Sequence, residues 1–309
     1  MKPHLSNLLI YLRKNFPATY LHWLKFQKKK LPAKVSKVLE QNKPPVFYDS
    51  DDVFNKLQSE YSGVPEYGYD SYSTWKRGVD RTNELLQLDS INKAPKNILE
   101  AGCGDGMTAH ALTGYGHHLT LLDMEDWRDE RAKNLTFHKV DINQSLEFHA
   151  STFDLIYSFN TFEHLPDPEF TLKELMRLCR PGGYIYLEFG PLYASPWGLH
   201  AYRMLKMPYP QFLFSTEFIT DKLKKYGIND LGDDKRDELQ YVNKWTYQQY
   251  QNLFEQYKNY IVDTSAYKIY DHLQIIDNYP QAFTGQGLQL EDICTFAIKI
   301  VLKKNHDGN

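Results

Sequence analysis

Glycine at three alternate positions constrains this chain more than any other feature of its sequence. Gly102, Gly104 and Gly106 follow the short apolar segment 97–101, and a segment of helical character begins at Met107. The pattern predicts a strand, a tight turn and then a helix. Because glycine has no Cβ, a bound molecule can approach the backbone here, and the amide groups that open the helix favour a polar or anionic group. We therefore expect a cofactor at the end of a first strand.

The glycine spacing favours one kind of cofactor site over another. A dinucleotide pattern, G-x-G-x-x-G, needs its third glycine at position 107 or 109, where the chain has Met107 and Ala109. Alanine is allowed at the last place, so Gly104 to Ala109 is an acceptable but poorer fit. The compact pattern E-x-G-x-G-x-G, from Glu100 to Gly106, fits at every position.

The segments that follow alternate between strand and helix. Residues 118–123 end in Asp123, whose carboxylate can accept both hydroxyls of a ribose, and residues 135–142 contain Asp141. A fourth strand begins at Phe153 and leads into a loop. Beyond it we predict a helix over 168–179, a turn over 180–183, a fifth strand over 184–189, an insertion over 190–242, a helix over 246–258 and strands over 260–270 and 293–302.

The run from Asn97 to Phe189 resembles the core of the class I S-adenosylmethionine-dependent methyltransferases. E-x-G-x-G-x-G, F-D-L-I-x-S, E-H-L-P-D and R-P-G-G carry the resemblance, and together they are far more specific than a glycine turn. It implies an α/β, Rossmann-like, doubly wound fold with a mostly parallel seven-stranded sheet and an antiparallel last strand. We expect a basic, then Tyr-rich, helical extension over 1–80 and a methyltransferase domain over 81–309, with a substrate or lid insertion at about 190–242.

The resemblance also implies S-adenosylmethionine as the cofactor and a set of residues that bind it. Asp123 would hold the ribose, Asp141 would face the adenine amino group, and the backbone amide of Ile142 would meet the ring. The expected set is Glu100, Gly102, Cys103, Gly104, Gly106, Asp123, Met124, Asp141, Ile142 and Asn160. Cys103 also suits a space-filling role, and three scattered cysteines indicate neither a disulfide framework nor a zinc site. We expect no metal.

Two histidines are candidates for the catalytic base. The methyl donor is already activated, so alignment and water exclusion can supply much of the rate, but a hydroxyl acceptor also needs a base. Histidine titrates in the useful pH range. His164 follows the fourth strand, although Glu163 and His164 also suit a structural role at a helix start. His200 lies in the insertion beside Tyr202 and Arg203.

Aromatic side chains gather before the first strand and in the insertion. The segment 72–78 and a helix over 79–88 fit the helices that close over the cofactor in this family, where rings can cover the cationic sulfur. The insertion would form the acceptor pocket or its lid, because it leaves the carboxyl edge of the sheet. Its rings suit either stacking on an acceptor or a small core, and both remain open: Tyr193, Trp197, Tyr202, Tyr209, Phe212 and Phe214.

The first 45 residues are strongly basic, with ten Lys or Arg and one acid, whereas the whole chain carries −3. Pro17 and Pro32 would divide this region into short amphipathic helices. It could dock on anionic lipid or a phosphate-bearing substrate, or pack on the acidic body or on a second subunit in a homodimer. The acidic body argues against nucleic acid. No run has the length of a membrane span and no signal peptide is evident, so we expect a cytoplasmic protein.

Two functions remain open. The first is a methyltransferase, acting on a hydroxyl of a small polar metabolite or a glycan precursor. The second is a non-catalytic S-adenosylmethionine-binding regulatory subunit. Both hypotheses share the cofactor contacts of Asp123 and Asp141.

Overall fold

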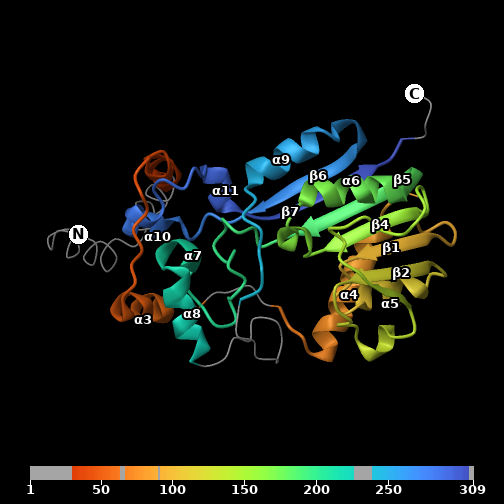
Figure 1. The fold of residues 1–309 in the computed structure, drawn as a ribbon, viewed down its shortest axis with the longest axis horizontal. Helices are drawn as coiled ribbons and strands as arrows, with labels where there is room; N and C mark the ends of the chain where they lie inside the picture. The colour runs from red at the N-terminus through yellow and green to blue at the C-terminus, as the bar shows by residue number, and fades with distance from the viewer. Residues whose placement is uncertain (1–29, 63–66, 90, 226–238, 306–309) are drawn as a thin grey trace, which may run out of the picture.

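A computed structural model describes residues 30–62, 67–89, 91–225 and 239–305, and in these residues seven strands form one sheet (Figure 1). The strand order is β3-β2-β1-β4-β5-β7-β6, with β1 to β5 parallel and β7 antiparallel to both of its neighbours. The strands are β1 Asn97–Ala101, β2 His118–Asp123, β3 Thr136–Lys139, β4 Phe153–Phe159, β5 Cys179–Phe189, β6 Ile261–Lys268 and β7 Thr295–Lys303. The Rossmann-like fold expected from the sequence is confirmed.

Helices cover both faces of this sheet, with α4 and α5 on one face and α6 and α9 on the other (Figure 1). The central strand β4 is buried at every position but one, as a strand covered on both faces requires. The α-helices are α3 Asp51–Glu60, α4 Ser71–Leu85, α5 Met107–Thr113, α6 Pro168–Leu178, α7 Pro210–Leu213, α8 Thr216–Lys224, α9 Tyr247–Glu255, α10 Leu273–Asn278 and α11 Leu290–Cys294, and residues 30–39 are also helical. Short 3₁₀ helices are η1 Glu130–Ala132, η2 Phe162–His164, η3 Lys258–Tyr260 and η4 Pro280–Ala282.

A second hydrophobic core lies beside the sheet, where the N-terminal helices meet the insertion. Leu57 of α3 packs in one cluster with Phe212 of α7, Ile219 of α8 and Ile276 of α10. Figure 1 shows these helices together at the end of the molecule away from α4 and α5. Three of the insertion's rings belong to this core, which confirms the core role for Tyr209, Phe212 and Phe214.

Several predicted boundaries are wrong by a few residues. The third strand ends at Lys139, because the Asp141 carboxylate accepts from the Asn143 amide at 2.8 Å and turns the chain. The segment 180–183 is not a turn ahead of the fifth strand but an irregular part of β5, since Gly182 donates to the Lys304 carbonyl at 2.7 Å. Residues 293–294 end helix α11, which a capping box at its start stabilises, and β7 follows.

The helix predicted over 79–88 begins earlier, at Ser71, and ends at Leu85. The Asp70 side chain accepts from the amides of Tyr72 and Ser73, an N-cap that starts the helix there. Helix α4 therefore continues across residue 80, the expected boundary between the N-terminal extension and the methyltransferase domain. That boundary stays a prediction.

The basic N-terminus is described only in part. Pro32 lies inside helical residues 30–39, and the residues before 30 lie outside the described part of the chain, so the predicted division at Pro32 stays a prediction. Pro17 lies outside the described residues. Among those described, no helix combines the length and the apolar character that a bilayer span needs.

Candidate active site

The glycine turn, residues 102–106, is hydrogen-bonded to the end of β2, and part of its backbone is not covered by neighbouring side chains. The amides of Gly102 and Cys103 both donate to the Leu122 carbonyl, at 2.9 and 3.0 Å. At Gly102, φ is +77° and a Cβ would overlap the Thr161 side chain, so only glycine fits. At Gly104, φ is +51° and a Cβ would meet nothing within 4 Å. The backbone at Gly104 is therefore accessible to a ligand.

Asp123 ends β2 directly beside this turn. Its Oδ2 accepts from the Gly104 amide at 2.9 Å, and its Oδ1 accepts from the Met124 amide at 2.8 Å. Burial raises the pKa of Asp123, while these amide hydrogen bonds oppose the rise. A carboxylate offers about four lone-pair directions, so two bound amides leave capacity for two hydroxyl donors. Met124 itself is 63% exposed, and only its amide serves the turn.

Glu100 and Cys103 lie buried beneath the turn. Burial raises the pKa of the Glu100 carboxyl well above its usual range, and the nearby Tyr157 hydroxyl opposes the rise only in part, while Oε2 makes no hydrogen bond of regular geometry among the described residues. A buried polar atom of this kind is expected where a ligand supplies the partner. Burial also raises the pKa of the Cys103 thiol, which suits the space-filling role. The open backbone at Gly104, the oriented Asp123 and the orphan oxygen of Glu100 together fit a nucleoside ligand that carries an amino-acid group.

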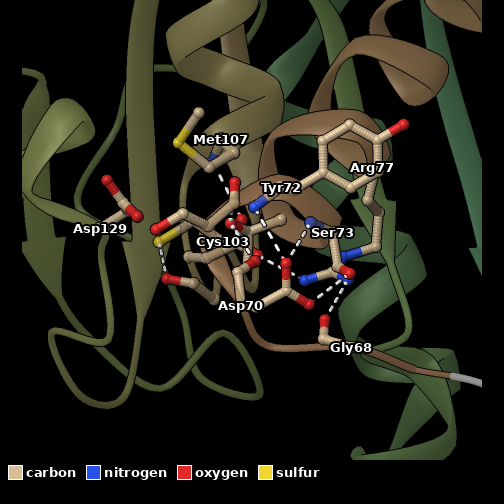
Figure 2. Close-up of polar contacts among 12 residues, drawn as sticks. Gly68, Asp70, Tyr72, Ser73, Arg77, Cys103, Met107 and Asp129 are labelled. Atoms are coloured by element: carbon tan, nitrogen blue, oxygen red, sulfur yellow. Dashed lines mark hydrogen bonds and ion pairs between the residues drawn. The ribbon is translucent and has the colours of Figure 1, made fainter.

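Arg77 of α4 joins the segment before the helix to the glycine turn (Figure 2). Its Nη2 lies 2.8 Å from Oδ2 of Asp105, and its Nη1 donates to the Gly68 carbonyl at 2.9 Å. The Tyr67 ring lies 4.2 Å from the guanidinium carbon, a cation–π contact. Tyr67 and Gly68 are thus held beside the turn. The expectation that aromatic rings ahead of β1 cover the cofactor stays a prediction.

The remaining expected cofactor residues lie at the ends of β3 and β4 and at the start of α5. Asp141 is two residues beyond β3, and the Ile142 side chain packs in the core, so only its backbone could meet an adenine ring. Asn160 follows β4 with φ of +51°, and its amide donates to the Glu188 carbonyl at 2.8 Å. Gly106 precedes α5, and a Cβ there would press on Ala132.

Both candidate bases lie together at the carboxyl ends of β4 and β5. The His164 and His200 ring centroids are 4.8 Å apart at 79°. Each ring is held by a backbone carbonyl: His164 Nδ1 lies 2.5 Å from the Tyr241 oxygen, and His200 Nε2 lies 2.7 Å from the Pro191 oxygen. A ring nitrogen facing a carbonyl must carry the hydrogen, which assigns the tautomer of both.

Glu163 completes this group, and sequence reasoning gave it no role beyond structure. It is 1% exposed, its Oε1 accepts from the Gly190 amide at 3.1 Å, and burial raises its pKa to about 8. Burial, followed by the neighbouring His164, lowers the pKa of His200 to about 3, so this ring is neutral at pH 7. The available signal was an acid directly after Phe162 and directly before a candidate histidine, just beyond the fourth strand.

The cofactor side and the histidine side of the site adjoin. Thr161, two residues before Glu163, lies against the Gly102 backbone, with its hydroxyl 3.5 Å from the Gly102 carbonyl oxygen. In an open α/β sheet, ligands bind outside the carboxyl ends of the strands. A glycine turn after β1 in a sheet of this order defines the class of Rossmann-like S-adenosylmethionine-dependent methyltransferases.

Comparison with known proteins agrees with this class. A family model described as a methyltransferase domain matches residues 70–262, and the chain belongs to that family. The ubiquinone biosynthesis O-methyltransferase of Aromatoleum aromaticum is 28% identical over 115 residues, which are 33% of this chain and 49% of that protein. The same-named protein of Coxiella burnetii is 34% identical over 100 residues, 30% of this chain and 43% of that protein.

The matches to these relatives span about half of their length. Among solved structures, an S-adenosylmethionine-dependent methyltransferase from Mesorhizobium loti is 15% identical with a TM-score of 0.44, and the match covers 73% of this chain and 96% of that chain. Because the chain belongs to the methyltransferase-domain family and has the glycine turn and the oriented Asp123 of a nucleoside site, S-adenosylmethionine is its cofactor. When bound, it supplies a methyl group on a cationic sulfur, which leaves as a neutral thioether.

Proposed function

We propose that this protein is an O-methyltransferase that acts on a hydroxyl of a small polar acceptor, such as a metabolite or a glycan precursor. The observation that carries the proposal is the group formed by Glu163, His164 and His200 at the carboxyl ends of β4 and β5. Thr161, two residues before Glu163, contacts the Gly102 backbone, and His200 belongs to the insertion. Two relatives that share part of the sequence are named as O-methyltransferases, and this supports the same class of acceptor atom here.

Each part of the site would have a distinct task. The glycine turn, Asp123 and the backbone at Ile142 would bind and orient the cofactor. The insertion would exclude water from the acceptor, which strengthens polar interactions inside the site. His164 and His200 would provide the basic groups near which the acceptor hydroxyl loses its proton. Because burial lowers the pKa of His200 to about 3, that ring would mainly orient the hydroxyl, and the more exposed His164 would accept the proton.

The test is the formation of S-adenosylhomocysteine with a panel of nucleotide sugars, lipid-linked sugars and phenols. With an acceptor in hand, we expect His164→Gln to lower turnover by about 10²–10⁴-fold, the usual contribution of a general base. His138→Gln is the matched control, since His138 is an exposed residue of β3. Calorimetry with S-adenosylmethionine should show unchanged cofactor binding in both variants.

Two results would contradict the proposal. The first is cofactor binding without turnover of any hydroxyl in the panel, as the regulatory-subunit hypothesis expects. The second is transfer to nitrogen or carbon acceptors with His164→Gln as active as the parent protein.

A further inference from the structure

Glu163, His164 and His200 together offer one carboxylate oxygen and two imidazole nitrogens, all within 4.8 Å of one another. They come from the loop after β4 and from the insertion, so the fold alone brings them together. Sequence reasoning expected no metal, because it weighed the scattered cysteines and could not see this approach.

The buried Glu163 carboxylate has one oxygen that is not used in a hydrogen bond among the described residues. Its Oε1 accepts from the Gly190 amide, whereas its Oε2 has no hydrogen-bond partner among the described residues. The residue is 1% exposed, so water does not readily supply the missing partner. A buried carboxylate oxygen without a partner is unfavourable unless a ligand or an ion completes it.

The histidines are supported in the way that metal-binding histidines usually are. One nitrogen of each ring faces a backbone carbonyl, of Tyr241 for His164 and of Pro191 for His200. Such outer contacts fix the tautomer and turn the opposite nitrogen toward a metal. The ring centroids lie 4.8 Å apart at 79°, so the two rings meet edge to face rather than stacked.

The distances suit a cation after a small closure. Metal bonds of about 2.0–2.1 Å place ligand atoms roughly 3–3.5 Å apart in regular geometries. His164 Nε2 lies 3.9 Å from Glu163 Oε1, and no ligand pair exceeds 4.8 Å. Side-chain movements of about 1 Å would therefore bring all three ligand atoms within bonding distance of one cation. Further coordination positions of the cation would stay open.

We propose that Glu163, His164 and His200 bind one first-row divalent transition-metal cation at the acceptor side of the site. Two imidazoles and one carboxylate favour Mn²⁺, Fe²⁺, Co²⁺ or Zn²⁺ over Mg²⁺ or Ca²⁺, which prefer all-oxygen sites. The same ligand set occurs at catalytic zinc sites that keep an open position.

The cation would bind the acceptor oxygen, a role that rests on the proposed function. An oxygen bound to a divalent cation loses its proton at lower pH, the O–H electron pair stays on oxygen, and the proton passes to solvent. The histidines would then act as ligands rather than as free bases. An acceptor with two adjacent oxygens would bind best, because it can fill two open positions.

The test uses Co²⁺ as the probe, since nitrogen ligands give this ion visible absorption bands. Metal-free full-length protein is titrated with Co²⁺ by spectroscopy and calorimetry, without an acceptor. We expect one site per chain, with affinity at least tenfold weaker in Glu163→Gln and His164→Gln. His138→Gln should bind like the parent. Thermal unfolding and S-adenosylmethionine binding establish that each variant is folded.

Failure of the two proposals can be told apart. Equal Co²⁺ affinity in the parent and in His164→Gln, whose side chain is partly exposed and tolerant of change, would overturn the cation site whatever the acceptor. If Co²⁺ binds but turnover is unchanged after chelation, the acceptor role of the cation is wrong and the histidines act as bases. If no hydroxyl acceptor exists, the proposed function fails, while the cation titration still decides the site.

Discussion

Arg77 Nη2 lies 2.8 Å from Asp105 Oδ2, which ties helix α4 to the glycine turn. The side chains are 15% and 27% exposed, so this ion pair is partly shielded from water. The same guanidinium holds the Gly68 carbonyl (Figure 2). One side chain therefore links the position of the segment before α4 to the conformation of the cofactor turn.

Removing this link should weaken cofactor binding. We expect Arg77→Met to raise the Kd for S-adenosylmethionine about tenfold, or ~1.4 kcal/mol, by calorimetry. The neighbouring pair of Lys76 and Asp80 is an exposed ion pair on the same helix, with both side chains 56% exposed. Lys76→Met should therefore leave the Kd unchanged. Equal effects of the two changes would mean that Arg77 acts only on general helix stability.

Asp123 should contribute directly to cofactor affinity. Its carboxylate is oriented by the amides of Gly104 and Met124, and the assigned ribose contact would use its remaining lone pairs. We expect Asp123→Ala to weaken S-adenosylmethionine binding by about 1–3 kcal/mol, the cost of leaving buried polar groups unpaired. Glu125→Gln, at an exposed position two residues on, is the control. An unchanged Kd in Asp123→Ala would remove the ribose contact.

Substitution of Gly102 should mainly lower stability, whereas substitution of Gly104 should mainly weaken cofactor binding. Gly102→Ala would place a Cβ on the Thr161 side chain, so we expect a clear loss of thermal stability. Gly104→Ala meets no neighbouring atom and should cost only the left-handed backbone term of about 1–2 kcal/mol, while its methyl group enters the ligand space. Thermal unfolding and cofactor titration of both variants would separate these effects. The hypothesis of an open cradle fails if Gly104→Ala binds the cofactor normally.

His117 should make stability depend on pH. Burial, followed by the charge of Lys96, lowers its pKa, and neither ring nitrogen has a hydrogen-bond partner among the described residues. As pH falls below about 6.5, His117 binds a proton in the unfolded chain but not yet in the folded chain. The free energy of unfolding therefore decreases as pH falls below that value, and it is constant above it.

The comparison that isolates this residue is His117→Phe against the exposed His118→Gln. Urea unfolding at pH 7.5 and 5.5 measures the slope. We expect His117→Phe to reduce the loss by up to about 1.4 kcal/mol per pH unit, and His118→Gln to leave it unchanged. A parent and a His117→Phe variant with the same pH slope would show that His117 is protonated within the fold.

The parallel part of the sheet could be predicted because its signals are local. The apolar runs of β2 and β4 begin at the predicted residues, and β2 also ends where predicted. The second core could not be predicted, because it joins residues 35–57 to residues 194–223 and 273–294, and no local pattern specifies that pairing. The boundary errors arose where a side-chain hydrogen bond, as at Asp141, outweighed the apolar pattern.

The candidate site, like the fold, could be predicted only in part. The glycine turn and Asp123 are adjacent to strand ends in sequence, and their close approach follows from the strand order. Glu163 was missed as a functional candidate because its burial depends on Gly190 and on the insertion, which sequence periodicity does not report. The link between Arg77 and Asp105 likewise joins two oppositely charged residues that look like ordinary surface charges.

The second core has a practical consequence for protein production. The family match begins at residue 70, yet Val35, Leu39 and Leu57 fill the space against α7 and α8. A fragment trimmed to the family boundary would expose the apolar side chains of α7 and α8 to water and would tend to aggregate. Expression trials should therefore keep the residues from 30 onward.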